Sequence, residues 1–216
     1  MLGTATPSAV ALIFASVQGS TGPLLGSLLA WRIHPAWYAV ALLGPPAVML
    51  IAMGIHVLLG GEHPAYPPAA RWPLVIVNFA IVLLLGGPLG EEIGWRGYAL
   101  PVLRDTHGLL PASLVLGIAW AGWHLPLFLL PGTPQADLPL PWFALQAVAL
   151  GVLLALVYEG TGGSLLLPML LHASVNTFSG PLRILPADGG STRPFVITAI
   201  LAWAAAGLVW AVTRRS

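Results

Sequence analysis

The feature that most constrains the fold is an apolar run, Leu74 to Leu89, that leads directly into the charged stretch Gly90-Glu91-Glu92-Ile93-Gly94-Trp95-Arg96-Gly97. An ionised side chain at the centre of a membrane helix costs about 2.5–3.5 kcal/mol, so charges in such a place are expected to be functional or paired. Apolar runs recur along the chain, which is 57% hydrophobic and only 7% charged. A soluble domain needs far more polar surface than this. We therefore predict an integral membrane protein.

The apolar runs predict an all-α membrane bundle of about seven helices within a single domain, residues 1–216. The two shortest runs, at residues 8–17 and 24–31, predict a short helix and an interfacial helix. Gly44-Pro45-Pro46 predicts a kink, because proline removes a helical hydrogen bond. Arg104 to Gly108 is expected to form a loop. The longer runs are residues 36–60, 72–89, 109–130, 139–158, 164–178 and 195–212, the last of them followed by Arg214-Arg215.

The low net charge and the absence of cysteine exclude several classes of function. The net charge is +1, all eight basic residues are Arg, and no tract of them is dense enough to bind nucleic acid. Cys is absent, which excludes disulfides and thiolate metal sites. Any metal would have to be held by His and by oxygen ligands.

The two adjacent glutamates are expected to have different roles. Residues of an α-helix advance by roughly 100° each, so Glu91 and Glu92 point in different directions, while Glu92 and Arg96 share a face at i and i+4. Glu92 paired with Arg96 would hold the helix in register and leave Glu91 without a partner in its own segment. The alternative is that all three form one buried ion-pair cluster.

Three further polar residues lie in other apolar segments: His124, His172 and Asn176. Each alone is compatible with a structural role, but convergence with Glu91 would satisfy all of them. Two chemistries then fit. In one, Glu91, His124 and His172 bind zinc, which acidifies a water molecule, and Asn176 steadies the oxyanion. In the other there is no metal: Glu91 and His124 deprotonate water, and His172 and Asn176 donate hydrogen bonds to the oxyanion.

The motifs resemble, in order, those of the CAAX prenyl protease and bacteriocin-processing (CPBP, ABI-type) intramembrane peptidases over about residues 70–180. They are Glu91-Glu92-x-x-x-Arg96, Trp120-x-x-x-His124 and His172-x-x-x-Asn176. The resemblance implies seven to eight helices around a polar intramembrane cavity. The segment before residue 36 is shorter than the family's usual N-terminal helices, so one early helix fewer is expected.

The resemblance also implies an activity: hydrolysis of a peptide bond near the C-terminus of a membrane-associated substrate, of the prenylated type in eukaryotic relatives. The site residues it implies are Glu91, His124, His172 and Asn176, supported by Glu92 and Arg96. The alternative is a catalytically silent scaffold, or a bacteriocin self-immunity protein that binds a peptide or partner. Arg without Lys is typical of a GC-rich bacterial genome, so the expected location is the bacterial cytoplasmic membrane.

Overall fold

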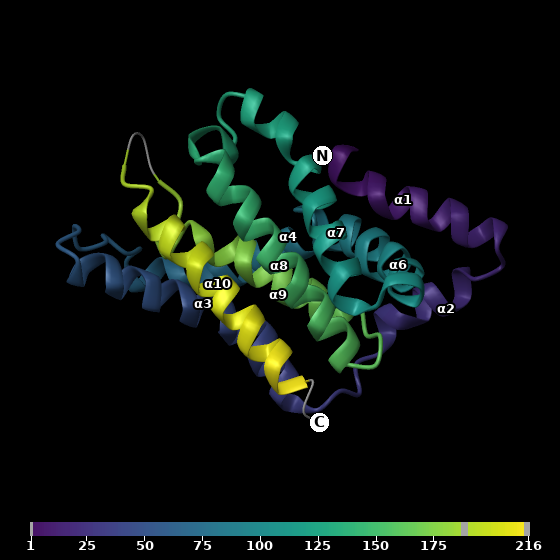
Figure 1. Cartoon of the computed structure of the whole chain (residues 1–216). Helices are drawn as coiled ribbons and strands as arrows, with labels where there is room; N and C mark the ends of the chain where they lie inside the picture. Colours follow the sequence, from purple (N-terminus) through teal and green to yellow (C-terminus); the bar gives the residue numbers. More distant parts are fainter. Residues whose placement is uncertain (1, 187–189, 214–216) are drawn as a thin grey trace.

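The computed structural model describes residues 2–186 and 190–213, and every regular element in these ranges is a helix. Figure 1 shows the helices crossing one another as a bundle, with α1 along one side. The α-helices are α1 (Leu2–Val17), α2 (Thr21–Gly26), α3 (Pro35–Leu58), α4 (Trp72–Leu85), α5 (Pro88–Glu92), α6 (Leu100–His107), α7 (Leu109–Trp123), α8 (Leu140–Gly160), α9 (Leu166–Ser179) and α10 (Arg193–Thr213). The prediction of an all-α fold is confirmed.

Shorter helical turns connect these elements. A π-helix, η3 (Ile93–Ala99), joins α5 to α6. The 3-10 helices are η1 (Ser27–Leu29), η2 (Ala69–Arg71), η4 (Leu125–Leu129) and η5 (Pro134–Asp137). The predicted interfacial helix at residues 24–31 therefore corresponds to α2 and η1 together.

The lengths and surfaces of the helices are those of a membrane protein. Five segments of the described chain are long and apolar enough to span a bilayer: Pro35–Leu58, Ala69–His107, Leu109–Leu129, Leu140–Gly160 and Arg193–Val212. In α4 no residue is fully buried, although nearly all of its side chains are apolar. Apolar surface exposed on this scale marks contact with lipid rather than with water. The prediction of a polytopic integral membrane protein is confirmed.

Helix α8 is the most buried of these spans and packs against α7, α9 and α10. Helix α8 crosses α7 closely. A Cβ atom added to Gly151 would lie only 2.9 Å from the Cα atom of Gly117. Small residues at a crossing let the backbones of membrane helices approach and gain van der Waals contact. The close crossing fixes the position of α7, whose C-terminal end reaches the candidate site.

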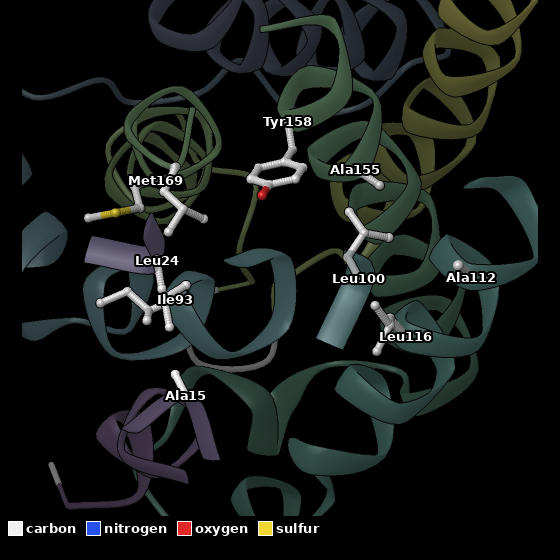
Figure 2. Packing of buried hydrophobic residues seen from close by; sticks show 10 residues of the cluster. Ala15, Leu24, Ile93, Leu100, Ala112, Leu116, Ala155, Tyr158 and Met169 are labelled. Atoms are coloured by element: carbon white, nitrogen blue, oxygen red, sulfur yellow. The ribbon is translucent and has the colours of Figure 1, made fainter. Parts of the chain in front are cut away.

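Helix α1 packs across α5 and η3 through two glycines of the charged stretch. A Cβ atom on Gly90 would overlap the carbonyl group of Thr4, and one on Gly94 would lie 2.5 Å from the carbonyl of Pro7. Figure 2 shows the apolar cluster beside this contact, where Ile93 of η3 packs with Ala15 of α1 and with residues of α2 and α9. The glycines therefore let α1 lie directly on the segment that carries the charges.

Two helix boundaries differ from the sequence-based predictions. The predicted span at residues 72–89 is divided, because α4 ends at Leu85 and Gly87 adopts a φ of 120° that favours glycine. The predicted loop from Arg104 is instead the last turn of α6, which ends at Gly108 with a φ of 81°. Arg104 stabilises this turn, since a cation is favourable near a helix C-terminus.

The boundaries of α3, α8, α9 and α10 lie within two residues of the predicted ones. Helix α3 continues through Pro45 and Pro46, the position of the predicted kink, and stays helical there. Helix α1 begins at Leu2, several residues before the predicted start at residue 8. The last span is α10, and Arg214 and Arg215 lie outside the described residues.

The close contact between α1 and η3 predicts that Gly94→Ala destabilises the protein. The added methyl group meets backbone atoms of Pro7, which cannot move aside cheaply, so we expect a loss of about 1–3 kcal/mol of unfolding free energy. Gly54→Ala in α3 is the matched control, since no atom lies within 4 Å of the added Cβ. Thermal unfolding in detergent measures both, and equal stability of the two variants would contradict this packing.

Candidate active site

The six candidate residues come from three helical segments that meet inside the bundle. Glu91 and Glu92 end α5, and Arg96 lies one turn later in η3. His124 immediately follows α7, and the pair His172 and Asn176 lies on α9. Helix α5 begins at Pro88, directly after Gly86 and Gly87. It places the two glutamates next to the end of α7 and to α9.

The carboxylate of Glu92 joins two of these segments. Its Oε1 atom accepts hydrogen bonds from NH1 of Arg96 at 3.0 Å and from Nδ1 of His172 at 2.8 Å. Glu92 is fully buried, and Arg96 and His172 are 2% and 3% exposed. The predicted Glu92–Arg96 pair is present, although it spans a π-helical rather than an α-helical turn. The contact with His172 was not predicted, because His172 is 80 residues away in the sequence.

Glu91 points to a different neighbour, as the sequence predicts. Its Oε2 atom accepts a 2.6 Å hydrogen bond from the indole Nε1 of Trp120 in α7, and the residue is 4% exposed. A Cβ atom at Gly87 would lie 2.7 Å from the other carboxylate oxygen, so the glycine leaves room for it. The guanidinium carbon of Arg96 lies 4.8 Å from the centre of the Trp120 ring, a cation–π contact.

His124 is held in one tautomer by the backbone. Its Nδ1 atom lies 2.7 Å from the carbonyl oxygen of Trp120. A carbonyl oxygen only accepts, so Nδ1 must carry the hydrogen and donate it, and Nε2 of the neutral ring keeps its lone pair. The sequence places His124 within the apolar run at residues 109–130, which predicts a position inside a helix. It instead lies at the C-terminal boundary of α7 and is half-buried, which leaves its ring accessible.

The four predicted catalytic residues line one cavity of about 670 Å³: Glu91, His124, His172 and Asn176. The cavity therefore brings together side chains from α5, the end of α7 and α9. Asn176 is exposed, and its side chain makes no hydrogen bond within the described part of the chain. The histidine rings flank Trp120 edge-on, with centroid distances of 5.3 Å for His124 and 5.1 Å for His172.

Trp120 contacts more of the site than its motif indicated. It donates to Glu91, offers its carbonyl oxygen to His124 and lies beneath Arg96. The spacing Trp120-x-x-x-His124 was a signal that the two residues share a helix face, but it did not reveal the indole as the donor to Glu91. That bond depends on how α5 and α7 are rotated about their axes.

The side chains do not form a ready metal-binding set. Among residues 2–186 and 190–213, no three His, Asp or Glu side chains are grouped so that they could hold a metal ion. Glu91, His124 and His172 are instead arranged around the Trp120 indole. As placed here, the three side chains that the sequence offered as zinc ligands do not form a coordinating group.

Comparison with known proteins places this region in a family. Residues 72–178, which include all six candidate residues, match the family model described as type II CAAX prenyl endopeptidase Rce1-like. CAAX prenyl protease 2 of Methanococcus maripaludis is 28% identical over 139 residues, which cover 61% of this chain and 51% of the relative. The chain thus spans about half the length of this curated relative.

The buried position of Glu92 predicts a large loss of stability in Glu92→Ala. The substitution leaves Arg96 buried without its ion-pair partner, and breaking a buried pair costs about 3–5 kcal/mol. Glu159→Ala is the matched control, because Glu159 pairs with Arg104 at 2.8 Å on the surface, with 43% and 34% of the two side chains exposed. We expect the control to lose no more than about 1 kcal/mol.

Unfolding in detergent, followed by circular dichroism, measures both variants. A Glu92→Ala protein as stable as the Glu159→Ala protein would show that Glu92 does not support the site.

Proposed function

We propose that the chain is an intramembrane endopeptidase, because residues 72–178 match the family model of type II CAAX prenyl endopeptidases, Rce1-like. The observation that carries the proposal is the shared cavity, lined by a carboxylate, two imidazoles and an amide within the membrane-spanning bundle. Glu91, His124, His172 and Asn176 are the residues we assign to catalysis.

In the proposed reaction Glu91 is the general base. Trp120 holds one of its oxygens, and the other is free to accept a proton from a water molecule in the cavity. His124 assists, since its Nε2 lone pair can accept the second hydrogen of the same water and orient it. The hydroxide attacks the carbonyl carbon of the substrate peptide, and the proton on Glu91 then passes to the leaving amine nitrogen. Glu91 thus returns to its starting state, and the reaction consumes only the peptide and one water molecule.

The oxyanion that forms on the attacked carbonyl needs hydrogen-bond donors. Asn176 offers the two amide N–H groups of its side chain, four residues after His172 on the same face of α9. Nδ1–H of His172 donates to the Glu92 carboxylate, which fixes the orientation of the ring. In the proposed step the ring also carries a hydrogen on Nε2, which it donates to the oxyanion. Donors held in a dry site stabilise developing charge without reorganisation. Glu92 and Arg96 therefore position His172 and take no part in bond making.

We propose that the substrate is a membrane-associated peptide or protein, cleaved near its C-terminus after a prenylated cysteine. The family description and the name of the relative both refer to CAAX prenyl proteolysis. A cavity of about 670 Å³ lies within the range of sites that enclose a short peptide or a drug-sized ligand. The use of eight Arg without Lys supports a bacterial cytoplasmic membrane as the location.

Glu91→Gln is expected to abolish cleavage while the protein stays folded. The amide keeps the shape of the side chain and an oxygen for the Trp120 indole, but it cannot accept a proton from water. We expect cleavage to fall by about 10²–10⁴-fold. The measurement is the release of the C-terminal tripeptide from a farnesylated CAAX peptide in detergent, with unfolding temperature as the measure of folding.

His124→Ala should lose activity in the same assay, and Glu159→Ala should retain it. If Glu91→Gln and His124→Ala cleave as fast as the parent, the catalytic assignment is wrong. If no variant, including the parent, cleaves any CAAX peptide, the alternative of a silent scaffold or immunity protein is supported instead.

We propose a reaction without a metal, since the candidate ligands do not form a coordinating set. Purified protein should therefore retain full activity after treatment with a chelator, and metal analysis should find zinc well below one equivalent. A stoichiometric zinc ion whose removal abolishes cleavage, and whose return restores it, would overturn this route and support Glu91, His124 and His172 as ligands.

A further inference from the structure

One polar side chain of the bundle is not explained by the catalytic groups. Gln146 of α8 lies in the wall between the large cavity and a narrower groove of about 150 Å³. Leu150 and Val175 line both spaces with it, and the groove is otherwise almost wholly apolar. Gln146 is therefore an amide in an apolar partition beside the candidate active site.

The Gln146 amide is left without a partner. Its Oε1 atom is buried and accepts no hydrogen bond within the described part of the chain. A buried acceptor without a donor destabilises a protein, whereas an apolar side chain of similar shape avoids that cost. Methionine, almost the same size as glutamine, would suit the surrounding leucine and valine side chains better. Folding alone thus gives no reason for a glutamine here.

A bound peptide supplies what this amide lacks. A peptide whose scissile carbonyl lies near Glu91 has neighbouring backbone N–H and C=O groups in the same cavity, and these groups lose hydrogen bonds to bulk water when the peptide enters. A carboxamide offers one acceptor and two donors, which is complementary to a peptide group. Rotation of the Gln146 amide toward the cavity breaks no hydrogen bond of Oε1, because that atom has none.

We propose that Gln146 is a substrate-positioning residue that hydrogen-bonds a backbone peptide group next to the scissile bond. The inference rests on the proposed peptidase function, since it assigns a further residue to that cavity. Gln146 holds the peptide in register against Glu91 and does not itself take part in the chemical step.

The test uses Gln146→Met in the full-length protein. We expect unfolding temperature to stay the same or rise, while the Kd for an uncleavable farnesylated CAAX peptide and the KM for its cleavable form rise roughly fivefold to tenfold, with little change in kcat. A residue needed only for structure would instead lower stability. Gln18→Met is the control, because Gln18 pairs with the hydroxyl of Tyr98 and lines neither space.

A second substrate isolates the hydrogen bond. In a depsipeptide, an ester oxygen replaces the N–H of the peptide group next to the scissile bond. We expect this change to weaken binding to the parent protein but to add little to the loss already caused by Gln146→Met, since the two changes remove the same bond.

Equal penalties for the ester in both proteins, an unchanged Kd, or a fall in unfolding temperature would overturn the inference. The binding measurement does not require turnover. Failure of the parent protein to cleave therefore counts against the proposed function, and an unchanged Kd in Gln146→Met counts against the role of Gln146.

Discussion

The arrangement of the site depends on one buried carboxylate. Glu92 has no access to water, so its charge must be balanced by protein groups, and both Arg96 and Nδ1 of His172 bond to the same oxygen. In a low-dielectric interior such contacts are strong, and an unpaired member is costly. The bond between Glu92 and His172 joins α9 to the end of α5. It also fixes the orientation of the His172 ring, which faces the cavity.

Trp120 also fixes the positions of three side chains of the site, each by a different type of contact. Its indole donates to Glu91, its backbone carbonyl accepts from His124, and its ring lies beneath the Arg96 guanidinium. The two neighbouring glutamates thereby acquire separate surroundings: Glu92 faces Arg96 and His172, while Glu91 faces the Trp120 indole and the cavity. Two carboxylates with such different partners are suited to different roles, one structural and one chemical.

The bundle combines close backbone packing with a few buried polar atoms that have no hydrogen-bond partner within the described residues. Glycine crossings at Gly117–Gly151 and at Gly90 and Gly94 bring backbones into close contact. Five buried side-chain atoms of the described residues have no hydrogen-bond partner, and two of them, Oε2 of Glu92 and Oε1 of Gln146, belong to the site or to its wall. Local departures from good packing and polar satisfaction are expected where a protein binds and reacts with a substrate.

The sequence alone determined the all-α membrane fold and the separate roles predicted for Glu91 and Glu92. The length of an apolar run and the cost of a charge within it are local properties, and i,i+4 spacing places Glu92 beside Arg96 on any helical turn. Only the tertiary structure decided that Glu92 bonds to His172, that Trp120 donates to Glu91 and that His124 lies at the end of its helix. It also decided that Oε1 of Gln146 has no hydrogen-bond donor among the described residues. These contacts depend on how distant helices are rotated and how closely they cross, which no periodicity within one segment specifies.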